Sequence, residues 1–274
     1  MTRIAFIGGG NMARSLVGGL LKTGFAASSL SVAEPRADAR QQLGRDFGVA
    51  CYAENRLAAA DADVLVLAVK PQIMPAVHAE LQDVLQRQRP LLISIAAGVR
   101  IDQLERWFGH ALPIVRCMPN TPALIGAGAT GLCANRRVSP EQRAQAQHIL
   151  DAVGLTQWID DEALMDTVTA ISGSSPAYFF ALVEALEDAA FAQGMPREVA
   201  RALAAQSCLG AGRMLAESGE DPGVLRQRVT SPHGTTQAAL ESFAADHFHQ
   251  AVAHAVAAAT RRGAELAASL DDRP

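Results

Sequence analysis

Short apolar runs alternate with longer amphipathic segments along the chain as far as Ile159. Each run has the length of a strand and stops at glycine, proline or a polar residue, which is typical of strands buried on both faces of a parallel sheet. In the segments between them, such as 12–24, apolar residues recur at helical spacing. The pattern predicts an α/β domain whose strands cover 3–7, 30–33, 49–52, 63–69, 91–97, 114–118 and 155–159.

Beyond Asp160 and Asp161 the chain is rich in alanine and leucine and contains only short turns. We therefore expect two domains, an α/β domain over 1–161 and an all-α domain over 162–274. The predicted helix 178–192 is apolar around most of its circumference, and such a helix has to be covered by other protein. This predicts a homodimer at least.

Composition narrows the class of protein. The chain has 274 residues, half of them apolar, a formal net charge of −4, and lysine only at Lys22 and Lys70, which disfavours a nucleic-acid surface. Its four cysteines lie far apart without a metal-binding spacing, as expected of reduced thiols. No run is apolar enough to span a membrane and no signal peptide precedes the first strand, so we expect a soluble cytoplasmic protein.

A glycine turn joins the first strand to the first helix. The sequence Gly8-x-Gly10-x-x-Ala13 follows the apolar run 3–7 and opens the helix 12–24. Glycines let the backbone approach a diphosphate, and the free N–H groups at a helix start donate to it. The order of strand, glycine turn and helix predicts a Rossmann-type dinucleotide-binding domain.

Glu34 follows the second predicted strand, where such a domain places its ribose-binding group. A carboxylate accepts hydrogen bonds from a ribose 2′-hydroxyl and repels a 2′-phosphate, whereas Arg36 and Arg40 are placed to pair with that phosphate. The sequence leaves open which cofactor is preferred, and also whether Glu34 merely begins a turn. Farther on, we expect Asn55 to cap a helix, and Lys70 to lie at the ligand-binding edge of the sheet or simply in solvent.

Two segments of the helical half, 172–176 and 230–236, combine hydroxyl groups with glycine and precede helices. Such segments either bind a small anion such as a carboxylate or only cap the helices that follow. The second segment is the richer in donors, which favours an anion site there. The histidines 247, 249 and 254 lack the spacing of a metal site and are expected on a solvated face, so no metal is predicted.

Five motifs, in this order, resemble those of the pyrroline-5-carboxylate reductase family. They are I-G-G-G-N-M-A at 7–13, L-A-V-K-P-Q at 67–72, M-P-N-T-P at 118–122, S-G-S-S-P-A-Y at 172–178 and V-T-S-P-H-G-T-T at 229–236. The resemblance implies a Rossmann domain, a helical dimerisation domain that can build larger assemblies, and reduction of 1-pyrroline-5-carboxylate to L-proline with NADPH or NADH. It implies cofactor contacts by Gly8, Gly10, Asn11, Met12, Asn55, Ala68, Val69, Lys70 and Pro71, to which the strand-end position adds Glu34.

By the same resemblance, Ser231, Gly234, Thr235 and Thr236 bind the substrate. We expect Ser231 and the N–H groups of 234–236 to hold its carboxylate, while the Thr236 hydroxyl hydrogen-bonds the ring nitrogen and orients the carbon that receives hydride. His233 departs from the family, which usually has a small residue there. A histidine adopts a positive φ only at some cost, and we expect its side chain to point outward.

Two other functions fit part of the pattern. A β-hydroxyacid dehydrogenase shares the two-domain layout but uses a lysine in its helical domain to move a proton, and this chain has none there. A non-catalytic dinucleotide sensor would share the fold, because fold does not fix function, but would not need the polar segment 230–236. The size of the assembly and any feedback by proline are not encoded in a recognisable motif.

Overall fold

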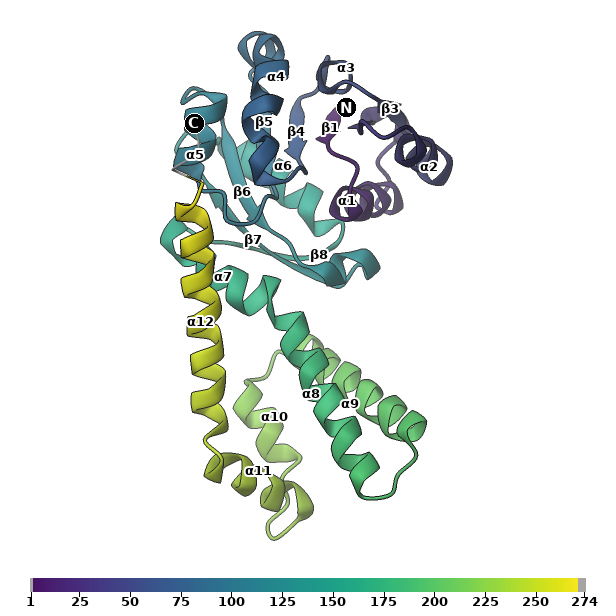
Figure 1. Cartoon of the computed structure of the whole chain (residues 1–274), viewed down its shortest axis with the longest axis vertical. Coiled ribbons are helices and arrows are strands. Elements are labelled where there is room, and N and C mark those ends of the chain that lie inside the picture. Colours follow the sequence, from purple (N-terminus) through teal and green to yellow (C-terminus); the bar gives the residue numbers. More distant parts are fainter. Residues whose placement is uncertain (1, 271–274) are drawn as a thin grey trace. The chain divides into compact units, whose positions relative to one another are not determined.

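The computed structural model describes residues 2–270 and divides the chain into two compact units (Figure 1). One unit contains the chain up to Ser174 and again from Ala259 onward. The other contains Ser175–Ala258. The units are described separately below.

A single sheet forms the centre of the first unit. Its strand order is β3-β2-β1-β4-β5-β6-β7-β8, and neighbouring strands from β3 to β6 are parallel. This is the order 3-2-1-4-5-6 of a dinucleotide-binding fold, which confirms the predicted fold class of this half. The strands are β1 (Ile4–Ile7), β2 (Leu30–Ala33), β3 (Ala50–Tyr52), β4 (Val64–Leu67), β5 (Leu91–Ser94), β6 (Ile114–Met118), β7 (Gly128–Ala134) and β8 (Gly154–Trp158).

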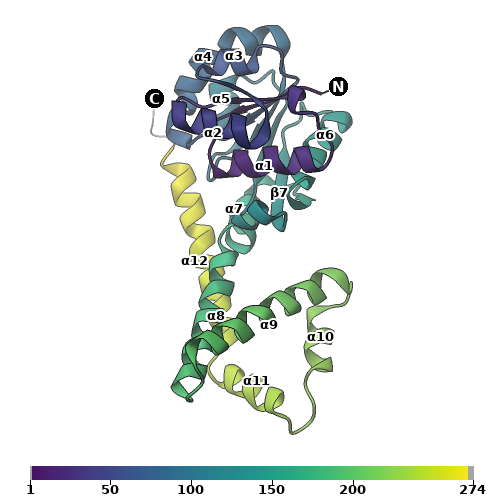
Figure 2. The ribbon, with the colours of Figure 1, turned by 90° about the vertical axis from the view of Figure 1, so that its right-hand side faces the viewer.

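Helices cover both faces of this sheet, as Figures 1 and 2 show. They are α1 (Asn11–Lys22), α2 (Ala37–Phe47), α3 (Asn55–Ala59), α4 (Met74–Gln88), α5 (Ile101–Phe108) and α6 (Pro140–Asp151). Alternate residues of a strand face opposite sides. Phe6 therefore packs in one apolar core with residues of α1 and α6, and Ile7 packs in another with residues of α4 and α5.

The sequence pattern missed β7. This strand, Gly128–Ala134, is antiparallel to β6 and parallel to β8, and it is rich in glycine and alanine rather than in large apolar residues. The small residues have a packing reason, because a Cβ on Gly131 would lie 2.6 Å from Cγ1 of Val168. The other predicted strands are all present, several of them shorter than expected.

The starts of α6 and α3 are capped in different ways. Ser139 caps α6, since its hydroxyl accepts the N–H of Gln142 at 3.2 Å while the Gln142 side chain accepts the N–H of Ser139 at 3.0 Å. These two bonds form a capping box. The cap expected at Asn55 is wrong. Glu54 holds the N-cap position of α3, and the Asn55 side chain donates instead to Glu80 at 2.7 Å.

The segment after the last strand packs with the sheet. It comprises η4 (Glu162–Leu164), α7 (Met165–Val168) and the π-helix η5 (Thr169–Gly173). Buried Arg116 on β6 pairs with Glu162 at 2.9 Å and lies 3.6 Å from Asp166. The compact unit therefore continues beyond Asp161, as far as Ser174. The boundary at Asp161 was placed where the strands stop, and it remains a prediction.

The second unit is entirely helical. It contains α8 (Ser175–Ala192), α9 (Arg197–Glu217), α10 (Pro222–Arg228), α11 (Thr235–Ala245) and the start of α12 (Phe248–Ala268), and α8 and α9 lie side by side (Figure 2). Apolar side chains of α8 remain in solvent, with Phe179 54% and Phe180 68% exposed. Exposed apolar surface of this kind marks an interaction site, which agrees with the predicted homodimer. Among residues 2–270 no helix combines the length and hydropathy that crossing a membrane requires.

Candidate cofactor and substrate sites

The turn after β1 brings two strands together at the carboxyl edge of the sheet. The N–H of Ala68, just after β4, donates to the carbonyl of Ile7 at 2.8 Å. Gly8 has φ +102°, and a Cβ there would lie 2.6 Å from the Ala68 carbonyl oxygen. Only glycine fits this position, which lies at the edge where open α/β sheets bind ligands.

Gly10 leaves room for a ligand at the start of α1. A Cβ built on Gly10 would meet no atom within 4 Å, although Gly10 is the N-cap residue. Arg14 makes the first backbone bond of the helix, to Gly10, and the N–H groups of 11–13 find no acceptor among residues 2–270. Free N–H groups beside open space fit the diphosphate of a dinucleotide, as the sequence predicted.

The other predicted cofactor residues lie along the same edge. Val69 packs close to Gly8, and Lys70 is exposed, makes no ion pair with the described residues, and precedes η2 (Pro71–Ile73). Asn55 is half-buried at the start of α3, immediately beyond β3. Glu34 is buried and its carboxylate accepts the N–H of Gly9 at 3.2 Å. Glu34 is thus more than the first residue of a turn.

Two motifs far apart in the sequence meet beside β6 and β7. The side chain of Asn120 donates to the carbonyl of Ser172 at 3.0 Å and accepts the N–H of Ala129 at 2.9 Å. Gly173 packs against the end of the Met118 side chain, because a Cβ on Gly173 would lie 2.4 Å from Cε of Met118. The sequence indicated both motifs but nothing in it showed that Asn120 connects them.

Ser172 takes neither of the two roles considered for the segment 172–176. The Ser172 hydroxyl donates to the carbonyl of Ala129 at 2.8 Å and is not free for an anion, nor does Ser172 cap a helix, because it lies inside η5. A π-helical turn is rare and occurs often near functional sites. Here the π-helical turn, Thr169–Gly173, belongs to the same compact unit as the sheet.

In the helical unit, the segment 230–236 ends at the start of α11. Gly234 is the N-cap residue, and its own N–H donates to Ser231 at 3.0 Å. Within the described residues, the N–H groups of 235–237 and the hydroxyls of Thr235 and Thr236 form no hydrogen bond. Three backbone donors and two hydroxyls at one helix start suit a carboxylate.

His233 adopts φ +60°. This is the left-handed conformation, which a histidine adopts only at a cost in free energy. Its N–H donates to Oε1 of Gln237 at 2.8 Å, which ties this residue to the first turn of α11. The residue is exposed, consistent with the expected outward side chain.

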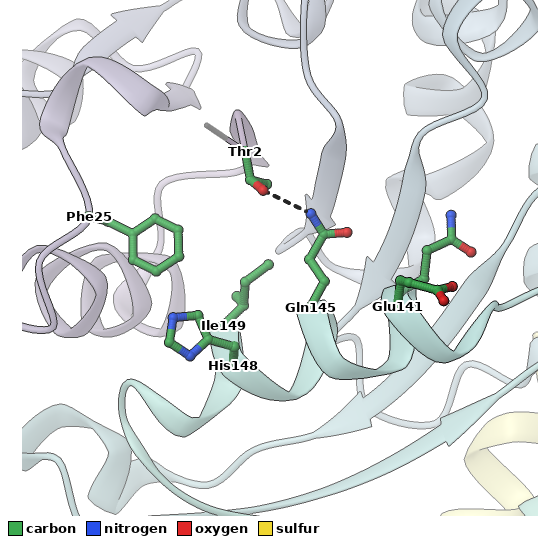
Figure 3. Close-up of a pocket in the computed structure, with 7 residues that line it drawn as sticks. Thr2, Phe25, Glu141, Gln145, His148 and Ile149 are labelled. Atoms are coloured by element: carbon green, nitrogen blue, oxygen red, sulfur yellow. Dashed lines mark hydrogen bonds between the residues drawn. The ribbon is translucent and has the colours of Figure 1, made fainter.

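Other features fit catalysis less well. A hollow of about 390 Å³ between β1's lead-in and α6 is lined by Thr2, Phe25 and His148 (Figure 3). It lies at the amino end of β1, away from the glycine turn. Burial raises the pKa of Cys117, whose thiol is enclosed in the core, so that it is unsuited to act as a nucleophile. No group of three or more metal-binding side chains occurs within residues 2–270.

Comparison with known proteins identifies relatives along the whole chain. Residues 162–266 match the family model "Pyrroline-5-carboxylate reductase dimerisation", and residues 3–98 match "NADP oxidoreductase coenzyme F420-dependent". A pyrroline-5-carboxylate reductase of Pseudomonas aeruginosa is 50% identical, with 98% of each chain covered.

Solved structures agree. A pyrroline-5-carboxylate reductase from Coxiella burnetii has a TM-score of 0.94 and 42% identity, covering 97% of this chain and 98% of the other. A pyrroline carboxylate reductase from Plasmodium falciparum with NADP bound has a TM-score of 0.83 and 30% identity, with the same coverage.

Proposed function

Since this chain belongs to the pyrroline-5-carboxylate reductase family, we propose that it reduces 1-pyrroline-5-carboxylate to L-proline with a nicotinamide cofactor, the last step of proline biosynthesis. The predicted family, enzyme class and use of NADP are confirmed by its relatives. The roles of individual residues are our proposal, supported by the geometry of the two sites.

At the sheet edge, the chain's own groups bind and orient the cofactor. The free N–H groups of 11–13 face the open space above Gly10 and suit a diphosphate. We assign the remaining contacts to Asn11, Met12, Asn55 and the segment 68–71, all of which follow strands at this edge. When bound, the reduced cofactor supplies a hydride to carbon, and the protein must supply alignment.

In the helical unit, the segment 230–236 is our candidate for substrate binding. Ser231 and the N–H groups of Thr235 and Thr236 hold the carboxylate, whereas the N–H of Gly234 already donates to the carbonyl of Ser231. The Thr236 hydroxyl hydrogen-bonds the ring nitrogen, and the C=N bond is attacked most readily when this nitrogen is protonated. Hydride then adds to the ring carbon of the C=N bond and forms a C–H bond. The π electron pair of the C=N bond passes to nitrogen. The observation that carries this assignment is that the N–H groups of 235–237 and the Thr236 hydroxyl have no partner in the described chain.

The chain matches its family's dimerisation model and exposes apolar side chains on α8. We infer a homodimer or larger homo-oligomer, with a domain over 1–161 for the cofactor and a domain over 162–274 for assembly and substrate. The four free thiols and the mildly acidic charge support a cytoplasmic enzyme that does not bind nucleic acid.

Oxidation of NADPH upon addition of 1-pyrroline-5-carboxylate tests the function directly. We expect NADPH absorbance to fall and L-proline to accumulate in equal amount. A protein that binds NADPH but leaves its absorbance unchanged with this substrate would instead support a non-catalytic dinucleotide sensor. The β-hydroxyacid dehydrogenase alternative lacks its lysine, because both lysines of the chain lie within the first seventy residues.

A further inference from the structure

The Glu34 carboxylate already accepts three hydrogen bonds. Its Oε2 accepts the N–H of Gly9 at 3.2 Å, and its Oε1 accepts both the N–H and the Nε–H of Arg36, each at 3.1 Å. The Glu34 side chain is only 8% exposed. Three of the roughly four acceptor positions of this carboxylate are thus taken by Gly9 and Arg36, which leaves little capacity for the ribose hydroxyls that a Rossmann acid usually binds.

Arg36 has the opposite character. Its side chain is 67% exposed, and it is held through Nε while its two terminal nitrogens form no hydrogen bond to residues 2–270. A guanidinium held at one nitrogen keeps a fork of donors in a fixed plane, which matches the geometry of a phosphate. Arg40 is half-buried, and its Nη1 donates to the carbonyls of Glu34 and Pro35 at 2.8 and 2.6 Å, so that one of its two terminal nitrogens is already used by the backbone.

The net charge of this turn does not select a cofactor. Asp38, in the first turn of α2, is exposed and offsets one of the two arginines, as Glu34 offsets the other. What distinguishes the groups is free hydrogen-bonding capacity. The buried acid has little left, whereas the exposed guanidinium has an unused fork.

We propose that Glu34 is a positioning residue that ties the glycine turn to Arg36, and that Arg36 binds the adenosine 2′-phosphate, so that this chain prefers NADPH to NADH. The inference rests on the proposed function only in taking the ligand to be a nicotinamide dinucleotide. It answers the question that the sequence left open between Glu34 and Arg36.

Binding of two cofactor fragments tests the proposal without any turnover. Adenosine 2′,5′-bisphosphate and 5′-AMP differ only in the 2′-phosphate, and calorimetry on the intact protein gives both dissociation constants. We expect the bisphosphate to bind at least about tenfold more tightly, as charge-assisted hydrogen bonds imply. In Arg36→Ala this preference should disappear while the affinity for 5′-AMP stays within about twofold. A preference that survives in Arg36→Ala overturns the proposal.

Substitution of Glu34 separates a positioning role from a ribose contact by the sign of the effect. Glu34→Gln keeps the size of the side chain but cannot accept from both Gly9 and Arg36, so the preference for the bisphosphate should fall severalfold. If Glu34 bound the ribose directly and repelled the phosphate, the same change would raise that preference. Glu34→Asp keeps the charge but is too short to span both partners. It should behave like Glu34→Gln, and a preference retained in Glu34→Asp contradicts the positioning role.

A matched ion pair serves as control. Arg56 and Glu54 follow β3 with the same spacing and a contact of 2.7 Å, but both are exposed and neither contacts the glycine turn. Arg56→Ala should leave the preference for the bisphosphate unchanged. An equal fall there would show that general positive charge, not Arg36, is responsible. A wild-type protein that prefers the bisphosphate but fails to reduce the pyrroline would sustain this inference and reject the proposed function.

Discussion

The side-chain nitrogen of Asn120 lies 3.0 Å from the carbonyl oxygen of Ser172 and donates a hydrogen bond to it. The Asn120 oxygen accepts the N–H of Ala129 at 2.9 Å, and the Ser172 hydroxyl donates to the carbonyl of Ala129 at 2.8 Å. These three bonds connect the loop after β6, the start of β7 and η5 around one buried amide. Two motifs that are separate in the sequence therefore form one structural unit.

Replacing Asn120 should destabilise the protein and disturb its activity together. Asn120→Ala leaves the Ala129 N–H and one acceptor position on Ser172 without their partner in a site that is 8% exposed. We expect a loss of about 2 kcal/mol in the free energy of unfolding, measured by urea denaturation, and a lower turnover because the edge of the sheet shifts.

Asn135→Ala is the matched control for this prediction. The Asn135 amide is also fully used, accepting from Ile114 and donating to Leu112, but it lies near α5, away from both motifs. A similar loss of stability with normal turnover is expected there. Equal turnover in both variants would show that Asn120 has no role beyond stability.

The fold was largely predictable from the sequence, and the reason is physical. Strands buried on both faces, such as β4 (Val64–Leu67), need continuous apolar runs. Gly8 has to be glycine because its φ is positive and a Cβ there would collide with the Ala68 carbonyl. The residues proposed to bind the cofactor lie at one edge of the sheet because parallel strands end there. These features are local, so a sequence pattern records them.

Features that depend on contacts between distant segments were missed. β7 escaped because its small residues are set by contacts such as that of Gly131 with Val168, not by apolar periodicity. The role of Asn120 depends on a residue far along the chain, and the Ser172 hydroxyl is engaged because it donates a hydrogen bond to the carbonyl of Ala129. The choice between Glu34 and Arg36 likewise required the positions of their hydrogen-bond partners.

Removing the Thr236 hydroxyl should slow reduction far more than it weakens cofactor binding. If this hydroxyl orients the ring nitrogen, Thr236→Ala should lower kcat by about tenfold to a hundredfold, which corresponds to the loss of one hydrogen bond to a charged group in the transition state. The dissociation constant for NADPH should change less than twofold. Steady-state kinetics and a fluorescence titration measure the two quantities.

Thr230→Ala provides a comparison within the same segment. The Thr230 hydroxyl already donates to the carbonyl of Arg226 at 2.7 Å, so it is not available to a ligand. Turnover should fall much less in this variant. Normal turnover in Thr236→Ala would remove the proposed role of that hydroxyl.

His233 should be replaceable by asparagine with a gain in stability. Asparagine tolerates the left-handed conformation better than other residues that carry a Cβ, and His233 has φ +60°. We expect His233→Asn to raise the free energy of unfolding by roughly 0.5 kcal/mol, and His233→Val to lower it by about 1 kcal/mol or more because a β-branched residue resists that conformation. Thermal unfolding at fixed protein concentration measures both. A valine variant as stable as the asparagine variant would contradict the backbone explanation.

Phe180 should be essential to assembly. It is the most exposed phenylalanine of α8, at 68%, and a charged residue in its place could not be buried against a second copy without a partner. We expect Phe180→Arg to shift the protein toward monomer at micromolar concentration in analytical ultracentrifugation. Arg213→Glu, a change of charge at an exposed position of α9, is the control and should leave assembly intact. Wild-type protein that sediments only as a monomer would refute the homo-oligomer itself.

Glu187 should make stability depend on pH in the acidic range. Arg201 donates to both of its carboxylate oxygens, at 2.7 and 2.8 Å, and these bonds, assisted by Arg197, hold the pKa of Glu187 below its ordinary value of 4.5. Because the pKa is lower in the folded state than in the unfolded chain, ionised Glu187 favours folding. That contribution is complete above pH 4.5 and is lost as pH falls through the folded-state pKa.

The difference in unfolding free energy between wild type and Glu187→Gln should therefore be constant near neutral pH and shrink as pH falls below about 4.5. Urea denaturation from pH 7 to 3, at one protein concentration, measures it, and keeping the concentration fixed matters because assembly adds to apparent stability. Glu217→Gln, which breaks the exposed pair with Arg213, should have little effect at any pH. Arg201→Gln should reproduce the effect of Glu187→Gln at neutral pH, since either change breaks the same bidentate pair. A wild-type advantage that persists unchanged at pH 3 would mean that Glu187 acts by its shape and not by its charge.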